Sequence, residues 1–217
     1  YTTIAGPFAL IAQTSSFGLE SGITASFKPE KNYNFLDPNL GFVINGLYEN
    51  KFGSLFLKTG AGFEQKSCRS TVQFSDDYGI ITGDHTTKYY HDYITVSQQA
   101  GIYYGGNVFF GFSSLGVSGS RYMATHVKSD AIVIDGVTYP PPNTQQTMVS
   151  YDVTALVKTG LGVKIGENNQ LYLLDSYSHA FLAQWGTSDP SALVPGKNKT
   201  ASIKIRYSHS FQIFRFL

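Results

Sequence analysis

The sequence predicts an all-β fold, an antiparallel up-and-down transmembrane β-barrel of about eight strands. The segment from Ala201 to Phe216 alternates apolar and polar residues over a length that suits a tilted strand crossing a bilayer, about ten residues. Seven further segments alternate in the same way, separated by short turns and longer polar loops. Charged residues form only 14% of the chain, against about 25% in a typical soluble domain. Something other than water must therefore solvate much of the surface.

The expected strands alternate between tight turns and long loops. They cover about 16–27, 40–48, 54–66, 90–104, 108–122, 148–165, 170–181 and 201–216. Short turns follow the second, fourth and sixth strands, and long loops follow the others, including residues 75–85, a small hairpin over 132–137 and the prolines at 140–142. Residues 1–15 form an N-terminal extension of unknown structure, and residues 16–217 form the barrel. An even number of strands places both termini on one side, which this layout makes the periplasmic side.

The fifth expected strand changes the parity of its apolar residues. Phe110 and Phe112 are interpreted as facing outward, as are Leu115 and Val117 after them. The change near Ser113 predicts a β-bulge at that point.

Composition excludes several classes of partner and site. The 217 residues carry a net charge of +1 and no Lys/Arg-rich run, so nucleic acid is not an expected partner. The lone Cys68 rules out an intramolecular disulfide framework and a cysteine-rich metal site, and we expect a free thiol at an exposed loop margin. No apolar run approaches 18 residues, and no signal peptide opens the chain, which we take to be mature or trimmed.

The faces opposite the apolar ones place charges of both signs in the lumen. This predicted lumen charge network consists of Glu20, Lys58, Glu64, Asp152, Lys158, Lys164, Lys204 and Arg206. An eight-stranded barrel is only wide enough for its own side chains, so these charges are expected to pair, with Lys204 and Arg206 reaching toward carboxylates such as Glu20. The network predicts a filled lumen, and a narrow path for ions or small solutes is the alternative.

Aromatic residues gather near the expected strand ends. They are Phe27, Tyr33, Phe35, Tyr48, Phe52, Tyr89, Tyr90, Tyr93, Tyr103, Tyr104, Tyr207, Phe211, Phe214 and Phe216. Such clusters are typical of the aromatic girdles that mark both interfaces of a bilayer.

With these features the chain resembles the small eight-stranded outer-membrane barrels of the OmpA, OmpX and PorT-like family, over roughly Ser16 to Leu217. The most specific part is the closing strand with Phe211, Ile213, Phe214 and Phe216, because in such proteins an aromatic-rich last strand is the signal read by the barrel-insertion machinery. The chain departs from that pattern by ending in Leu217. No OmpA-type peptidoglycan-binding domain follows.

This resemblance implies an integral protein of the outer membrane of a Gram-negative bacterium. Its expected partners are the outer-membrane lipid, including lipopolysaccharide, the insertion machinery and other envelope proteins.

The five histidines do not compose a catalytic site. His209 and Ser210 resemble the His-x-Ser element of barrel lipid A deacylases in composition only, because here the two residues are adjacent. Asp84, His85, His91 and Asp92, with Asp175 and His179, could suit an omptin-like protease, but those barrels have more strands. His126 has no obvious partner. We therefore expect no catalytic residue, no metal, no cofactor and no enzyme.

The functional hypothesis is a non-catalytic outer-membrane protein that docks partners within an envelope complex for secretion or membrane biogenesis. A narrow pore and an outer-membrane hydrolase are the alternatives. A lipocalin-like barrel that binds an apolar ligand becomes the better interpretation if the chain is soluble without detergent.

Overall fold

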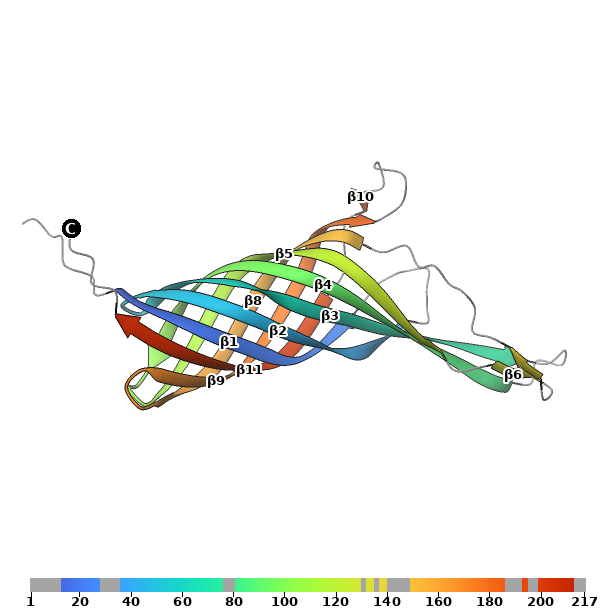
Figure 1. Ribbon diagram of the computed structural model, residues 1–217, viewed down its shortest axis with the longest axis horizontal. Coiled ribbons are helices and arrows are strands. Elements are labelled where there is room, and N and C mark those ends of the chain that lie inside the picture. Colours follow the sequence, from blue (N-terminus) through green and yellow to red (C-terminus); the bar gives the residue numbers. More distant parts are fainter. Residues whose placement is uncertain are drawn as a thin grey trace, which may run out of the picture.

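The computed structural model describes residues 13–27, 36–75, 81–129, 132–134, 137–139, 149–185, 193–194 and 199–212. Eight long strands form one antiparallel sheet that closes into a barrel (Figure 1). They are β1 (Gln13–Phe27), β2 (Leu36–Phe52), β3 (Leu55–Ser75), β4 (Ile81–Gly105), β5 (Phe109–Ser129), β8 (Val149–Ile165), β9 (Asn169–Trp185) and β11 (Lys199–Gln212). Three short strands accompany them: β6 (Ile132–Ile134), β7 (Val137–Tyr139) and β10 (Leu193–Val194).

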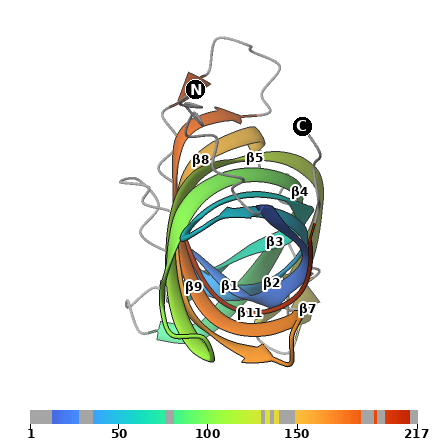
Figure 2. The same cartoon turned by 90° about the vertical axis from the view of Figure 1, so that its left-hand side faces the viewer.

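Each long strand pairs with its neighbours along the chain, and the first strand closes the ring on the last. β1 pairs with β11 from Thr14 opposite Gln212 to Phe27 opposite Lys199. Figure 2 looks into the resulting ring from the end of the tight turns. The predicted fold class, an up-and-down barrel of eight strands, is confirmed. No helix among the described residues is long and apolar enough to cross a membrane.

The pairing register fixes the shape of the barrel. The barrel can be followed once around by stepping from each residue to its partner on the next strand. Starting at Phe52 on β2, the steps lead through Leu55, Ile102, Ser113, Thr159, Asp175, Ile203 and Ile23 to Phe42, again on β2. One circuit therefore returns to β2 ten residues from its start. With a rise of about 3.3 Å per residue and strands about 4.8 Å apart, this stagger tilts the strands by about 40° and climbs about 25 Å. That climb equals the height of a typical outer-membrane apolar belt, about 25 Å.

Three tight turns lie at one end of the barrel, which we call the turn end. Phe52 pairs with Leu55, so β2 and β3 are joined by a two-residue turn. Its first residue, Gly53, has φ 66°, a conformation that a side chain disfavours. The beginning of β1 and the end of β11 lie at the same end, since Gln13 pairs with Phe52 and Thr14 with Gln212.

At the other end β3, β4 and β5 continue beyond their neighbours as an extension (Figure 1). The long loop predicted over residues 75–85 is wrong at Ser75 and over 81–85, because β3 reaches Ser75 and β4 starts at Ile81, and residues 76–80 lie outside the described residues. A strand outside lipid needs no apolar outer face, so hydrophobic alternation cannot mark it. The predicted small hairpin is confirmed as β6 paired with β7.

Inside and outside alternate along every barrel strand. On β9, Leu173 is 59% exposed, whereas its neighbour Leu174 is 2% exposed and faces the lumen. The last strand likewise exposes Ile203, Ile205 and Tyr207 while burying the polar residues between them. The exterior of the barrel is thus apolar and its interior polar, the reverse of a soluble protein.

The prediction for the fifth strand is wrong at Phe110, at Phe112 and at the bulge near Ser113, whereas Leu115 and Val117 face outward as predicted. Phe110 and Phe112 are buried in the lumen, and the pairing of β5 with β4 and β8 runs without a bulge past Ser113. The irregularity of β5 lies instead at Met123, because Asp92 pairs with Ala124 and Tyr93 with Tyr122. Aromatic residues fill this part of the lumen, so the inner face of the strand is as apolar as its outer face. The alternation of apolar and polar residues therefore could not tell the inner face from the outer one.

Two other expectations also need correction. Cys68 is buried within β3 and does not lie at an exposed loop margin. Tyr89, Tyr93 and Tyr103 face the interior and do not belong to an aromatic girdle. Phe17, Tyr48 and Phe211 do cluster on the wall near the turn end, with ring centroids 5.2 and 5.5 Å apart. Of the other predicted girdle residues, 33, 35, 214 and 216 lie outside the described residues.

The lipid-facing wall can be tested at Ile205, which is 57% exposed within the belt. We expect Ile205→Arg to lower the free energy of unfolding in lipid vesicles by about 3 kcal/mol, because the charge would lie against acyl chains. Val108→Arg, in the β4–β5 turn, is the matched control and should cost at most about 1 kcal/mol. Urea titration in vesicles measures both, and equal losses would refute the assignment.

Candidate functional site

The middle of the lumen holds an ion cluster centred on Glu20. Alternation along β1, β8 and β11 turns Glu20, Lys158 and Lys204 inward, and all three are buried. Lys158 Nζ donates to Glu20 Oε1 at 2.8 Å, and Lys204 Nζ lies 3.2 Å from the same oxygen. Asn45 Nδ2 also donates to it at 3.4 Å. One carboxylate thus joins four strands, β1, β2, β8 and β11, through the interior.

A second cluster, centred on Arg206, lies nearer the turn end. The Arg206 guanidinium lies 3.3 Å from Glu49 Oε2 and donates to the Tyr103 hydroxyl at 2.9 Å. Tyr103 in turn donates to Glu49 Oε1 at 2.7 Å. The guanidinium also stacks 3.6 Å from the ring centre of Tyr172, a favourable place for a cation.

Apolar and aromatic side chains fill the lumen beside these clusters. Phe56, Phe110, Phe112, Tyr172 and Leu174 form one buried group. The fully buried Lys58 lies against this group, its Nζ 5.4 and 5.2 Å from the rings of Phe56 and Phe112. Within the described part of the chain this ammonium makes no hydrogen bond. Together the ion clusters and the aromatic group plug the barrel.

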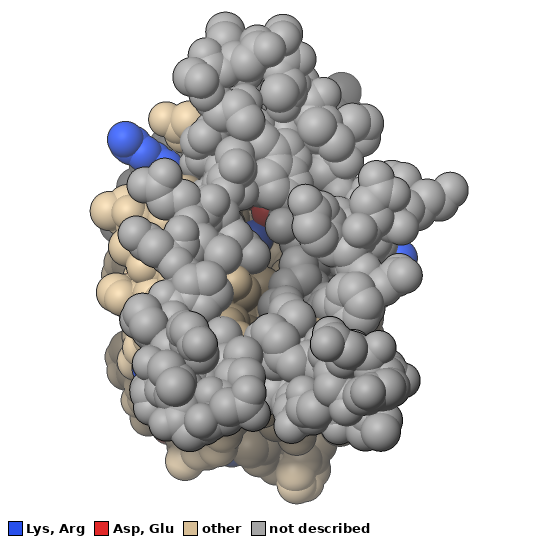
Figure 3. Space-filling view, turned by 90° about the vertical axis from the view of Figure 1, so that its right-hand side faces the viewer, with Lys and Arg blue, Asp and Glu red and all other residues tan. Residues whose placement is uncertain are grey.

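Beyond the plug lies a small polar cavity of about 40 Å³. Hydroxyl side chains from five strands line it: Thr95, Ser97, Ser118, Thr154, Ser176, Ser178, Thr200 and Ser202. Lys66 and Asp152 form a further ion pair on this side, at 2.9 Å. Seen along the barrel from the extension, a basic and an acidic side chain are visible in the interior (Figure 3). The cavity is large enough for about one water molecule.

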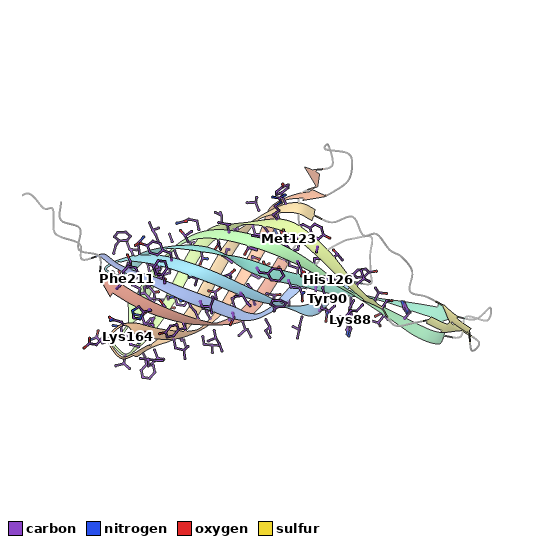
Figure 4. The ribbon with its side chains drawn as sticks, in the orientation of Figure 1. Lys88, Tyr90, Met123, His126, Lys164 and Phe211 are labelled. Atoms are coloured by element: carbon purple, nitrogen blue, oxygen red, sulfur yellow. The ribbon has the colours of Figure 1, made fainter. Side chains whose placement is uncertain are left out.

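The structure places the predicted charge network as follows. Glu20, Lys158 and Lys204 meet in the middle of the lumen, Lys58 and Arg206 lie nearer the turn end, and Glu64 lines the cavity. Asp152 pairs with Lys66, which also lines the cavity. Lys204 reaches Glu20, whereas Arg206 reaches Glu49. Lys164 does not join them: it is exposed at the turn end, where β8 has left the plugged lumen (Figure 4).

Sequence reasoning missed three members of the lumen clusters. Glu49 and Lys66 have the inward parity of β2 and β3, but each stood at the end of its expected strand and was not counted. Tyr103 was assigned to the wall with its neighbour Tyr104. Applying the alternation to the last two residues of each strand would have found all three.

The closing strand is only partly described. Phe211 is half-buried on the outer wall and stacks on Phe17 (Figure 4). Ile213, Phe214 and Phe216, the other residues of the predicted insertion signal, lie outside the described residues.

The histidines are spread over separate surfaces. His209 is exposed and contacts Asn169 at 2.9 Å, while Ser210 is buried on the opposite face. His126 was expected to lack a partner, which is wrong, because its Nε2 lies 2.9 Å from Asp92 Oδ2. Asp92 lies on β4 and His126 on the neighbouring strand β5, and the pairing of these strands in the extension brings the two side chains together, which their spacing in the sequence does not reveal.

Two further histidines have hydroxyl neighbours. His91 contacts Thr125 at 3.0 Å, and His85 contacts Ser129 at 2.8 Å. Among the described residues no three His, Cys, Asp or Glu side chains could hold a metal ion.

No known family model matches the chain, and neither does any curated protein sequence. Solved structures do match it. Neisserial surface protein A aligns over 91% of this chain and 97% of its own, with a TM-score of 0.55 at 8% identity. OprG of Pseudomonas aeruginosa covers 93% of this chain and 97% of its own, with a TM-score of 0.45 at 11% identity. Ail of Yersinia pestis covers 92% and 99%, with a TM-score of 0.42 at 12% identity.

The similarity to Neisserial surface protein A carries the comparison, since its TM-score is above 0.5. The protein therefore has the fold of the small eight-stranded outer-membrane β-barrels. At these identities the likeness defines the fold alone.

The lumen clusters give a stability test. Glu20→Gln should lower the free energy of unfolding by about 3 kcal/mol or more, because Lys158 and Lys204 would remain buried without their carboxylate. Glu64→Gln is the control: Glu64 is half-buried, and we expect a loss below about 1 kcal/mol. Urea titration in vesicles compares the two. A Glu20→Gln loss no larger than that of the control would show that the cluster does not hold the strands together.

Proposed function

We propose that the protein is a non-catalytic integral protein of the outer membrane that docks a partner protein through its lipid-facing wall. The short turns and both termini face the periplasm, and the extension faces outward, as the alternation of short and long connections favours. The observation that carries the docking proposal is a carboxylate on the wall, at Asp175.

Asp175 is an exposed carboxylate within the apolar belt. Its strand neighbours on the same face are Leu173 and Tyr177, and Ile203 is its partner on β11. On the line of paired residues that climbs about 25 Å from Phe52 to Phe42, Asp175 is reached after five of eight strand-to-strand steps. The carboxylate thus lies near the middle of the belt.

The surroundings satisfy only part of its hydrogen-bonding capacity. The Thr159 hydroxyl on β8 donates to Asp175 Oδ1 at 2.5 Å. A carboxylate has room for about four such bonds, and lipid chains supply none. Ionisable groups within a membrane are costly and mark functional positions. A membrane-embedded partner that brings a hydrogen-bond donor or a cation would complete the site.

The filled lumen supports docking over the two alternatives. A narrow pore would have to pass the Arg206 and Glu20 clusters and the aromatic group beside them. Planar-bilayer recordings test this alternative, and steady conductance would favour it. A hydrolase of the kind considered above would need one of its histidines. If the protein hydrolyses a substrate and the alanine variants of His85, His91, His179 and His209 keep full activity, the hydrolase alternative is excluded.

The docking proposal is tested with a photo-crosslinking amino acid at Leu161, which is 70% exposed on β8 and pairs with Leu173. In native membranes we expect a crosslinked partner that is lost in Asp175→Leu. Gln98→Leu is the control, because Gln98 accepts a bond from Thr59 at 2.6 Å on another part of the wall. Crosslinking that is indifferent to Asp175 would overturn the proposal, and a product of twice the chain mass would identify the partner as a second copy.

Asp175→Leu, which is expected to abolish docking, is expected to stabilise the isolated chain. In lipid vesicles without a partner, Asp175→Leu should raise the free energy of unfolding by about 1 kcal/mol, since a polar group leaves the hydrocarbon. Urea titration measures it. A destabilised Asp175→Leu barrel would mean that the carboxylate serves the fold and not a partner.

A further inference from the structure

The turn end of the barrel holds a cavity of about 370 Å³, which we call the mouth cavity. Seven of the eight long strands and all three tight turns contribute residues to its lining. Figure 2 looks toward this end of the ring. Pockets for small organic molecules have volumes of about 300–1,000 Å³, so the mouth cavity is large enough to hold one.

The floor of the mouth cavity is the plug of the lumen. Tyr103 and Phe110 both line the cavity, and their ring centroids lie 5.5 Å apart in an edge-to-face arrangement. Tyr103 belongs to the Arg206 cluster, and Phe110 belongs to the buried aromatic group. A molecule that enters the mouth therefore meets an aromatic surface, and the plug lies between it and the small polar cavity beyond.

Lys51 brings an ammonium group to this floor. Its Nζ lies 4.2 Å from the ring centre of Tyr103 and donates to Gln170 Oε1 at 3.0 Å. Glu49 Oε1 is 3.7 Å away. That carboxylate also serves Arg206 and the Tyr103 hydroxyl, at the shorter distances of 3.3 and 2.7 Å. An ammonium has three donors, so Lys51 is only partly neutralised by its surroundings.

A second cation, Lys164, lies beside the first. Lys164 on β8 pairs with Gln170 on β9, the residue that accepts from Lys51. Among the described residues Lys164 forms no ion pair. The lining contains one acidic residue, Glu167 in the β8–β9 turn. Residues 1–12 and 213–217, which continue from β1 and β11 at this end, contain no Asp or Glu. The mouth cavity is therefore electropositive.

A hydroxyl without a partner also borders the mouth cavity. Ser210 on β11 lines the cavity and is only 7% exposed, and its Oγ has no hydrogen-bond partner among the described residues. A buried polar group of this kind is costly unless something pairs with it. An anion that enters the mouth would thus meet two ammonium groups and a hydroxyl that can donate to it.

We infer that the mouth cavity binds a small organic carboxylate with an apolar body. The carboxylate accepts hydrogen bonds from Lys51, Lys164 and Ser210, and those from the ammonium groups are strengthened by charge. The apolar body packs on the rings of Tyr103 and Phe110. A bare anion such as phosphate suits the site less well, because it gains nothing from an aromatic floor and loses water there.

This inference goes beyond partner docking, because the two sites lie on different surfaces. Asp175 is exposed on the outer wall of β9, whereas the mouth cavity lies inside the ring at the turn end. Figure 4 shows Lys164 at the turn end and Lys88 far from it on the extension. In the orientation proposed above, the cavity opens to the periplasm, and the plug makes it a binding site and not an entrance to a pore.

The test uses the full chain in nanodiscs of neutral phospholipid, titrated with 3-phenylpropionate in a calorimeter, with empty nanodiscs as the background. Lys51→Met/Lys164→Met should weaken binding about tenfold, because two charge-assisted hydrogen bonds are lost. Added salt should weaken wild-type binding more steeply than binding by the variant. Lys88→Met removes an exposed cation of the extension. It is the matched control and should bind as the wild type does.

Further ligands test the chemical class. The neutral amide, 3-phenylpropionamide, should bind at least about tenfold more weakly than the acid, because it has no charge for the ammonium groups. Inorganic phosphate should compete poorly, and competition as strong as that of the acid would overturn the assignment to a carboxylate with an apolar body. Acetyl-alanyl-phenylalanine carries the same group at a peptide end. Its binding more tightly than the free acid would support the site with a peptide end as the ligand, and weaker binding would support it with a small acid.

Equal binding of 3-phenylpropionate by the wild type and the double variant would overturn the inference. Heat-modified gel mobility checks that the double variant still forms a barrel. If it does not, Lys164→Met alone decides the matter, since this exposed side chain can be changed without loss of the fold. It should weaken binding about threefold, and unchanged binding would equally overturn the inference. Asp175→Leu should bind normally, so failure of partner docking and failure of the mouth cavity are separable.

Discussion

The structure depends on one constraint, that lipid offers no hydrogen bonds to a backbone. Every strand within the belt must find partners on both sides, and the β1–β11 pairing meets this requirement by closing the ring. Closure with eight strands and a ten-residue stagger sets the tilt of the strands. The even stagger also keeps inward residues inward around the ring, so Glu20 on β1 and Arg206 on β11 share the lumen. The wall and the lumen are thus consequences of closure, and each strand contributes to both.

A narrow closed ring also explains why the lumen is filled. Its charged side chains cannot be hydrated individually, and an unpaired buried charge would be very costly. Glu20 and Glu49 therefore each serve cations from other strands, and their contacts join residues far apart in sequence, such as Glu20 and Lys158. Lys58 differs from the other buried cations of the described lumen clusters: its ammonium makes no hydrogen bond within the described residues, although Glu49 is its partner on β2 and two aromatic rings lie 5.4 and 5.2 Å away. These contacts stabilise the ring from within and leave little room for conduction or chemistry there.

The sequence was sufficient to predict the number of strands, their order and most of their faces, because alternation within lipid is an obligatory pattern. It failed where that pattern stops being obligatory. The extension of β3, β4 and β5 has no lipid to face, so its polar residues resembled a loop. Phe110 and Phe112 line an interior that is apolar near the turn end. Specific pairings, such as Arg206 with Glu49 or Asp92 with His126, depend on strand register, which hydrophobic pattern fixes only in parity and not in exact offset.

A comparison of two polar pairs on the wall shows why Asp175 carries the docking proposal and Gln98 does not. Thr59 and Gln98 are neutral side chains, and the Thr59 hydroxyl donates to Gln98 Oε1 at 2.6 Å. Thr159 gives Asp175 a bond of similar length, 2.5 Å, but it brings neither a charge nor a second donor. Lipid chains offer the carboxylate neither a cation nor a further hydrogen-bond donor, so its place in the belt is costly. In the docking proposal, a partner that supplies the cation removes this cost only when it binds, so the group expected to weaken the isolated barrel would favour association on one side of the ring.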